Sequence, residues 1–259
     1  MEIKIILFDL DFTLLHSDKS VSEYTVNVLK ECSKKGILTG FCTSRGNSTI
    51  KNLQELINPD IVICNSGACV YYHNQLIKSV TFSQEETHAI FENAYSVFGS
   101  EVEMTCDTLD DMYWNRKDSK SLPYNPNALY DDFRNFNQPA MKICIQTQDD
   151  KKINRVIEGI ENCDLIPFSD IPWYKLSPVN ASKEKGIVFL SEYLKVPLDN
   201  IVAFGDDFSD IGMLKMCGKG LAVANAIPQV REIADELTDS CDQDGVANWI
   251  VKAGVLGKQ

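Results

Sequence analysis

Two carboxylates near the N-terminus are spaced so that they could act on one substrate. Asp9 and Asp11 are separated by one residue, and the apolar run over residues 5–8 before them is typical of a buried strand in a parallel sheet. In open α/β sheets, ligands bind at the carboxyl ends of the strands, where both carboxylates would emerge. Like charges this close favour shared protons or a divalent cation with oxygen ligands, such as Mg²⁺. One carboxylate could then be a nucleophile and the other a general acid and base; an acidic turn capped by Asp11 or Thr13 is the alternative.

A second acidic cluster follows another apolar run. Residues 201–204 predict a buried strand, and Asp206, Asp207 and Asp210 come within the next six residues. Carboxylates packed this closely at a strand end are costly unless a cation binds them. The cluster therefore indicates a metal site, with Asp207 as a solvated charge beside it.

A hydroxyl pair and a lysine could contact a phosphate. Residues 37–42 predict a buried strand that ends at Thr43 and Ser44, before a helix expected over 48–57. A hydroxyl at this position can donate to a phosphate oxygen, and an ordinary helix cap is the alternative. Lys183 lies in the first turn of a helix expected to extend to Tyr193, where a cation is unfavourable for the helix dipole. Neutralising a phosphate and a nucleophilic carboxylate would account for that cost.

These segments, taken in chain order, resemble the motifs of the haloacid dehalogenase superfamily. The four matching segments are residues 9–13, 43–46, 182–187 and 205–210. Residues 65–68 and 220–226 resemble stretches of its Cof-like phosphatase branch. The chain departs from the usual patterns at Ser44, Glu184 and Ser209, where the family often has Gly, Gly and Asn.

The resemblance implies roles for four aspartates. Asp9 would be the nucleophile and Asp11 the general acid and base. Asp206 would bind Mg²⁺ directly, and Asp210 would act through water or orient Lys183. We expect the four aspartates to make up the Mg²⁺ site, with Mg²⁺ as the cofactor.

The same resemblance implies residues that bind the substrate. Thr43 would bind the transferring phosphoryl group together with Lys183. Ser44 could add a contact, and Asn65 and Asn225 would lie near the substrate phosphate.

The predicted elements indicate an α/β fold with an insertion. Alternating strands and helices over residues 1–81 and 178–259 are typical of a doubly wound, Rossmann-like parallel sheet. Residues 82–177 predict a compact α+β unit that resembles the inserted cap of the Cof-like branch. Helices are expected there at 83–98, 128–136 and 150–160, strands at 101–106, 109–114, 141–146 and 163–168, and a polar loop at 117–127.

Substrate selection is expected in this cap, because phosphate and metal contacts cannot distinguish one ester from another. Its Asp110, Asp111, Tyr113 and Trp114 combine carboxylates, which accept hydrogen bonds from hydroxyls, with aromatic faces that can cover a ring. A half-buried strand with a solvated acidic turn is the alternative.

Composition limits the partners. The 259 residues carry a net charge of −12, which argues against nucleic acid or an anionic membrane surface as partner. The nine cysteines are scattered without a C-x-x-C pair and sit mostly in apolar runs, which favours a reducing cytoplasm over a zinc site or a disulfide framework. No signal peptide or membrane-spanning run is apparent, and the sequence does not indicate an oligomeric state.

The predicted activity is Mg²⁺-dependent hydrolysis of a small phosphate monoester, a sugar phosphate or a phosphorylated cofactor, through an aspartyl-phosphate. A phosphotransferase or sugar-phosphate mutase would use the same intermediate and remains open. A dehalogenase would have no use for the acidic metal cluster. A non-catalytic phosphate-binding protein would be expected to lack one of the motif residues.

Overall fold

The computed structural model describes residues 2–117, 128–168 and 171–257 of the chain. They divide into two compact units, which we call the core unit and the inserted unit. The core unit comprises Met1–Ser44, Asn52–Lys78 and Ser182–Gln259, and the inserted unit comprises Arg45–Lys51 and Ser79–Ala181.

An eight-stranded sheet forms the centre of the core unit, in the order β14-β13-β12-β1-β2-β3-β4-β5. Neighbouring strands from β14 to β3 are parallel, and β4 pairs antiparallel with β3. Strands β12 and β2 flank β1 although they are far apart in sequence, so their carboxyl ends lie beside that of β1. The strands are β1 (Ile5–Phe8), β2 (Leu38–Cys42), β3 (Ile61–Cys64), β4 (Cys69–Tyr72), β5 (Gln75–Ser79), β12 (Ile201–Gly205), β13 (Lys219–Val223) and β14 (Glu236–Thr238).

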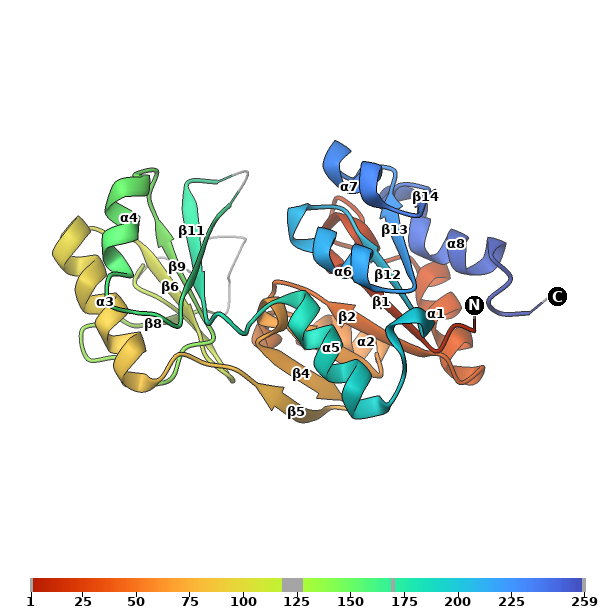
Figure 1. Ribbon diagram of the computed structural model, residues 1–259, viewed down its shortest axis with the longest axis horizontal. Coiled ribbons are helices and arrows are strands. Elements are labelled where there is room, and N and C mark those ends of the chain that lie inside the picture. The colour runs from red at the N-terminus through yellow and green to blue at the C-terminus, as the bar shows by residue number, and fades with distance from the viewer. Residues whose placement is uncertain (1, 118–127, 169–170, 258–259) are drawn as a thin grey trace. The chain divides into compact units, whose positions relative to one another are not determined.

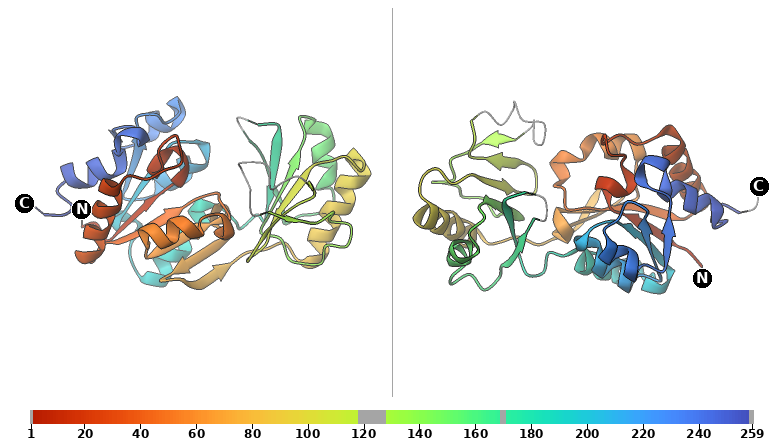
Figure 2. Two further views of the ribbon diagram at one scale, coloured as in Figure 1. Left: turned by 180° about the vertical axis from the view of Figure 1, so that it is seen from behind. Right: turned by 90° about the horizontal axis from the view of Figure 1, so that it is seen from above.

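Helices cover both faces of this sheet (Figure 1, Figure 2). Apolar residues of α5, α6 and α7 share one cluster with Ile5 and Leu7 of β1. On the other face, Phe8 contacts Phe41, and Phe204 contacts Trp249 of α8. Successive residues of a strand point to opposite faces of the sheet, and both faces are covered. Most residues of the central strands are therefore apolar, which explains the continuous apolar runs in the sequence. The helices are α1 (Glu23–Lys34), α2 (Lys51–Ile57), α5 (Lys183–Leu194), α6 (Ile211–Met216), α7 (Pro228–Ile233) and α8 (Gly245–Lys252).

The start of α1 differs from the sequence expectation. The pattern Ser20-x-x-Glu23 predicts a helix capped by Ser20, but the N-cap is Ser22, whose Oγ accepts a hydrogen bond from the Thr25 amide at 3.0 Å. Ser20 belongs to the preceding turn, because its amide donates to Asp18 Oδ1 at 2.9 Å. The expected helix over 48–57 is likewise divided into a 3₁₀ turn, Asn47–Thr49, and α2.

The inserted unit contains a six-stranded sheet in the order β10-β11-β9-β6-β7-β8. Its pairings are antiparallel except that β7 and β8 are parallel. Two helices pack on one face. The pattern Ser83-x-x-Glu86 predicts a capping box, and this box is present at the start of α3. The elements are α3 (Gln84–Phe98), β6 (Met104–Asp107), β7 (Met112–Trp114), β8 (Leu129–Tyr130), β9 (Lys142–Gln146), α4 (Asp150–Val156), β10 (Asp164–Pro167) and β11 (Trp173–Ser177).

The prediction of a helix at 128–136 is wrong. The segment contains β8 and then two turns in which Asp131 Oδ1 accepts from the Phe133 amide at 2.7 Å and Asp132 Oδ1 from the Arg134 amide at 3.2 Å. An aspartate carboxylate can accept a hydrogen bond from the backbone amide two residues further along, and this turn competes with a helix. Phe133 adopts a positive φ of 57° and stacks on Phe91, with ring centroids 4.3 Å apart. The polar loop expected at 117–127 lies, apart from residue 117, outside the described residues.

The predicted α/β fold is confirmed, with an insertion between β5 and α5. Of the nine cysteines, all but Cys163 are buried, as their apolar surroundings predict. None of the described helices is both long enough and apolar enough to cross a membrane.

The corrected start of α1 can be tested by thermal or urea unfolding. Ser22 Oγ also donates to Asp244 Oδ1 at 2.6 Å, so Ser22→Ala removes a helix cap and a bond to a carboxylate. We expect a loss of about 2 kcal/mol in the free energy of unfolding. Ser20 is exposed, so Ser20→Ala should change stability by less than about 0.5 kcal/mol. Equal losses in the two variants would contradict the assignment of the cap.

Candidate active site

The carboxyl ends of four adjacent parallel strands carry the predicted site residues. Asp206 follows β12, Asp9 follows β1, Thr43 follows β2 and Asn65 follows β3. This edge of a doubly wound sheet, beside its topological switch point, is where ligands bind. The fold thus brings residues from both halves of the core unit to one edge of the sheet.

The loop after β1 is held in an unusual turn. Residues Leu10–Leu14 form a π-helical turn in which Asp11 is extended, with ψ 124°, and Phe12 has a positive φ of 57°. The turn starts from Asp9, whose amide donates to the Phe204 carbonyl of β12 at 3.0 Å. Thr13 Oγ1 donates to Asp206 Oδ1 at 2.7 Å. The Thr13 hydroxyl therefore connects the first acidic motif to the second.

A buried lysine joins two of the aspartates. Lys183 Nζ lies 2.6 Å from Asp9 Oδ1 and 2.6 Å from Asp210 Oδ1, and the lysine side chain is only 2% exposed. The other oxygen of Asp210 accepts from the amides of Asp206 at 2.9 Å and Asp207 at 3.1 Å. Asp210 thereby holds Lys183 against Asp9 and fixes the turn that presents Asp206. Lys185, the other lysine in the segment 182–187 that resembles the family motif, is instead exposed.

Two glycines permit this close packing. Gly67 has a φ of +98°, and a Cβ there would lie 1.9 Å from the Ser182 carbonyl oxygen, directly before Lys183. A Cβ at Gly205 would lie 2.4 Å from Cβ of Asp210. Side chains at either position would displace the lysine or its partner.

The acidic cluster carries more negative charge than Lys183 balances. Burial raises the pKa of Asp9 to about 7, although the nearby Lys183 ammonium acts in the opposite direction. Burial also raises the pKa of Asp206 to about 8, and the charges of Asp9 and Asp210 add to the effect. Burial alone would lower the pKa of Lys183, but the carboxylates of Asp210 and Asp9 outweigh it and raise that pKa. The lysine thus remains charged while the carboxylates favour a further cation.

The donor set fits a divalent metal ion. Oxygens of Asp9, Asp206 and Asp210 lie within 4.8 Å of one another. Hard oxygen ligands of this kind suit Mg²⁺, and a divalent charge would relieve the repulsion that raises their pKa values. Since both oxygens of Asp210 already accept hydrogen bonds, Asp9 and Asp206 are best placed to hold the ion.

Asp11 lies outside this group of three carboxylates. Its side chain is 34% exposed and forms an ion pair with Lys19, at 2.9 Å. Lys19 Nζ also lies over the Phe12 ring, 3.8 Å from its centroid. The structure therefore places the Asp11 carboxylate toward solvent beside the cluster, where a leaving group or water could reach it.

The predicted phosphate contacts lie on the next two strand ends. Thr43 is 1% exposed; its amide donates to the Ile63 carbonyl at 2.8 Å, and its own carbonyl accepts from the Ser66 amide at 3.1 Å. Ser66 Oγ donates to Ser44 Oγ at 3.1 Å. Asn65 is buried at a positive φ of 49°. These hydrogen bonds hold the loop after β2 and the loop after β3 in a fixed position relative to each other.

Asn225 contacts the loop after β1. Its Nδ2 donates to the Phe12 carbonyl at 2.7 Å, and its Oδ1 accepts from the Cys241 amide at 2.8 Å. Phe12 is the positive-φ residue that separates Asp11 from Thr13. Asn225 is thus bonded to the backbone that carries the expected acid and base.

A hydrogen-bond network around Asp244 was missed by sequence reasoning. Asp244 Oδ1 accepts from His16 Nε2 at 3.1 Å, Ser22 Oγ at 2.6 Å and Thr25 Oγ1 at 2.8 Å. The place of His16 in the polar segment after Leu15 predicts a solvent-facing side chain, but the imidazole is partly buried against this carboxylate. The partners are 219 or more residues apart in sequence, so only the fold reveals the network.

The four predicted cap residues do not share one surface. Asp110 and Asp111 are exposed in the turn between β6 and β7. Tyr113 packs with the apolar cluster under the helices, and its hydroxyl accepts from Gln138 Nε2 at 3.0 Å. Trp114 belongs to a separate cluster with Trp173. Alternation along β7 directs Tyr113 and Trp114 to opposite faces of the sheet.

Residues 6–250 match the family of haloacid dehalogenase-like hydrolases. The chain belongs to this family. It is 27% identical to the 5-amino-6-(5-phospho-D-ribitylamino)uracil phosphatase YitU of Bacillus subtilis, with 95% of this chain and 96% of the relative covered. It is 26% identical to the phosphoglycolate phosphatase of Methanopyrus kandleri, with 96% of each chain covered.

The fold also matches solved structures. A haloacid dehalogenase-like hydrolase from Bacteroides thetaiotaomicron superposes with a TM-score of 0.85 at 21% identity, covering 97% of this chain and 100% of that one. The family resemblance expected from the four motifs is confirmed, as is the α/β fold.

The excess charge predicts an unusual pH dependence of stability without metal. An Asp206 carboxyl with a raised pKa binds its proton more tightly in the folded than in the unfolded protein. The free energy of unfolding should therefore fall as pH rises from the ordinary carboxyl range, about 4, toward about 8. Thermal unfolding in chelator should show this fall, and added Mg²⁺ should reduce it by stabilising the ionised cluster.

Asp206→Asn and Asp207→Asn provide a matched pair. Asp206→Asn should flatten the pH dependence in chelator and weaken the stabilisation by Mg²⁺, whereas Asp207→Asn should do so much less, because the Asp207 charge is the smallest of the effects that raise the pKa of Asp206. A melting temperature in chelator that is independent of pH, or equally altered by both variants, would show that the cluster does not carry this excess charge.

Proposed function

We propose that the protein is a Mg²⁺-dependent phosphatase that hydrolyses a small phosphate monoester through an aspartyl-phosphate on Asp9. The observation that carries this proposal is the buried contact of Asp9 with Lys183, at 2.6 Å, beside Asp206 at the carboxyl edge of the sheet. The names of the relatives, which are phosphatases of different phosphate monoesters, support it.

In the first step, the Asp9 carboxylate attacks phosphorus in line, and the bond from phosphorus to the leaving oxygen breaks. Asp11, protonated, gives its proton to that oxygen, and its partly exposed position beside the cluster suits this role. Lys183 and the Thr43 hydroxyl donate to the phosphoryl oxygens. Mg²⁺, held by Asp9 and Asp206, would supply further positive charge against those oxygens.

In the second step, Asp11 acts as a base. It removes a proton from water, which attacks phosphorus, releases inorganic phosphate and restores the Asp9 carboxylate. Lys183 stays bonded to Asp210 throughout, so a positive charge remains in place while Asp9 is phosphorylated. The lysine therefore stabilises the charge on the phosphoryl group with little rearrangement.

The substrate we propose is a small phosphorylated metabolite, a sugar phosphate or a phosphorylated cofactor, and the proposed location is the cytoplasm. The two relatives named above act on esters with very different leaving groups. Residues of the core unit suit phosphate and metal, so the inserted unit is proposed to select the ester.

The roles of the two aspartates can be separated by single-residue variants. Asp9→Asn should abolish turnover of p-nitrophenyl phosphate, because an amide does not attack phosphorus, while the protein stays folded. Asp11→Asn should slow turnover by about 10²–10⁴-fold, as removal of a general acid and base does. In the steady state, release of inorganic phosphate should match release of nitrophenol; a deficit that appears on addition of a sugar acceptor would indicate a phosphotransferase. Turnover near the wild-type rate in Asp9→Asn would exclude this mechanism.

Asn225 should act on the rate more than on substrate binding. Asn225→Ala releases the Phe12 carbonyl and with it the backbone of Asp11, which should lower kcat by up to about 100-fold with little change in KM. Asn225→Asp keeps the acceptor for the Cys241 amide but loses the donor to Phe12, so it should show the same effect. A rise in KM with kcat unchanged would instead make Asn225 a substrate contact, as the family resemblance implies.

A further inference from the structure

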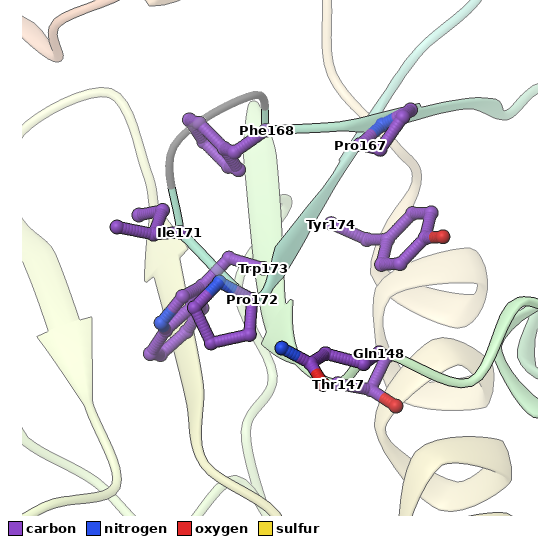
Figure 3. A pocket seen from close by; sticks show the side chains of 8 residues that line it. All are labelled: Thr147, Gln148, Pro167, Phe168, Ile171, Pro172, Trp173 and Tyr174. Atoms are coloured by element: carbon purple, nitrogen blue, oxygen red, sulfur yellow. The ribbon is translucent and has the colours of Figure 1, made fainter.

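A second ion pair lies in the core unit, in the segment between β1 and α1. Lys19 Nζ lies 2.9 Å from Asp11 Oδ1. The hollow of about 370 Å³ in the inserted unit differs from this region, because the described residues that line it, such as Gln148 and Trp173, have uncharged side chains (Figure 3). The mechanism proposed above uses Asp11 but gives Lys19 no part, so the function of this contact is open.

The Lys19 ammonium also lies on an aromatic ring. Its Nζ is 3.8 Å from the centroid of the Phe12 ring, so the face of the ring supports the cation. Both residues have a positive φ, 57° at Phe12 and 69° at Lys19, which is uncommon for side chains of this size. Such strain persists where the surrounding contacts impose it, and it is concentrated at functional sites. Two strained residues that meet beside Asp11 point to a function for their contact.

The turn that carries Lys19 is fixed to the rest of the core unit. The Lys19 amide donates to the His16 carbonyl at 2.9 Å, and the Ser17 amide donates to Asp242 Oδ1 at 2.7 Å. His16 Nε2 lies 3.1 Å from Asp244 Oδ1. An ion pair between mobile side chains at a surface contributes little, because ordering them costs entropy. Here the fixed turn reduces that cost, so the ion pair can persist.

A metal ion in the cluster would compete with Lys19 for Asp11. Asp9 and Asp11 are two residues apart, so their Cα atoms lie within about 7 Å of each other. A divalent ion held by Asp9 and Asp206 would attract a further carboxylate nearby, because Mg²⁺ prefers charged oxygen ligands. Asp11 nevertheless lies outside the group of three carboxylates that could hold the ion. The structure thus places the Asp11 carboxylate with Lys19 and apart from the cluster.

The proposed reaction requires this separation. Mg²⁺ at a phosphate site is usually bound by one or two carboxylates and keeps its other coordination positions for water and phosphate oxygens. Asp9 and Asp206 already supply two carboxylates. A third from Asp11 would occupy a position that the phosphate needs, and it would turn the Asp11 oxygens away from the leaving group.

We propose that Lys19 is a positioning residue that holds the Asp11 carboxylate off the metal ion, with the Phe12 ring as the support for the ammonium. The proposal rests on the phosphatase function proposed above, in which Asp11 exchanges protons with the leaving group and water. Lys19 acts in this role through Asp11, by competing with Mg²⁺ for its carboxylate. Loss of Lys19 therefore has two opposite consequences, tighter binding of Mg²⁺ and slower turnover.

Calorimetric titration of the metal-free protein with MgCl₂, at constant pH and ionic strength, measures the first consequence. Lys19→Ala should lower the Kd for Mg²⁺ by about tenfold, because the released Asp11 carboxylate adds a ligand. The substitution keeps a Cβ at this position, so the backbone cost of its positive φ is unchanged. Lys19→Arg keeps the cation and should bind Mg²⁺ as the wild-type protein does.

The same substitution in an Asp11→Asn background separates the carboxylate from the charge of the lysine. Removal of a nearby cation strengthens Mg²⁺ binding by Coulomb attraction alone, and salt screens this effect. Without a carboxylate to release, Lys19→Ala should therefore lower the Kd by only about threefold or less. Lys34→Ala is the matched control, since it removes a lysine from an exposed ion pair with Glu31 in the same unit, and it should leave the Kd unchanged. An equal change in both backgrounds, or none in either, would overturn the proposal.

Turnover of p-nitrophenyl phosphate at saturating Mg²⁺ measures the second consequence. Lys19→Ala should lower kcat by about tenfold or more, up to the loss of about 10²–10⁴-fold expected when the acid and base itself is removed, and Lys19→Arg should retain kcat. Tighter Mg²⁺ binding with an unchanged kcat would refute the positioning role. If the wild-type protein hydrolyses no ester, the proposed phosphatase function fails, and the Mg²⁺ titrations still decide whether Lys19 holds Asp11 off the metal.

Discussion

The core unit depends on one electrostatic constraint. Three aspartates and one lysine lie together, largely buried, at the carboxyl edge of the sheet, where water screens their charges poorly. Asp9, Asp206 and Asp210 come from two different strand ends, and within the described residues the ammonium of Lys183 is the cation bonded to two of them. A buried charge without compensation is among the most expensive features a fold can carry. The sheet order brings these charges together, because β1 and β12 are neighbours and point the same way. The remaining imbalance, visible in the raised pKa values of Asp9 and Asp206, is what makes the cluster receptive to a divalent cation.

Much of the structure around the cluster serves to hold it in one geometry. Thr13 ties the first acidic loop to Asp206, and Asn225 ties the backbone of the same loop to the segment that begins at Cys241. The network at Asp244 then joins that segment to the start of α1. Each tether links parts of the chain that are far apart in sequence. Such long-range bonds keep a strained loop, with its positive φ at Phe12, in a single conformation.

The sequence was sufficient for those features that depend on local pattern. Apolar runs located β1, β2 and β12, and the acidic residues after β1 and β12 located the site, because strand direction determines where the next residues emerge. The failures share a cause. The cap of α1 and the false helix at 128–136 were decided by aspartates that bond nearby amides, a competition that propensity alone does not resolve.

Other features required the tertiary structure. Nothing local to Asn225 shows that its amide reaches Phe12, and His16 gives no sign of its bond to Asp244. The opposite directions of Tyr113 and Trp114, however, follow from strand periodicity and could have been predicted. A stricter use of that alternation would have left only one of the two on the face that lacks helices.

The two units show one principle in different forms. Folded proteins satisfy nearly all of their buried polar groups, so exceptions tend to mark positions where a ligand completes the structure. In the core unit the exception is electrostatic, an excess of carboxylates that a cation would balance. In the inserted unit it is a matter of hydrogen bonding, since the described residues provide no partner for Trp114 Nε1 or Ser177 Oγ. The first exception favours a metal ion, because a cation reduces the repulsion among the carboxylates, and the second favours a group that offers hydrogen-bond acceptors, because an indole N–H can only donate.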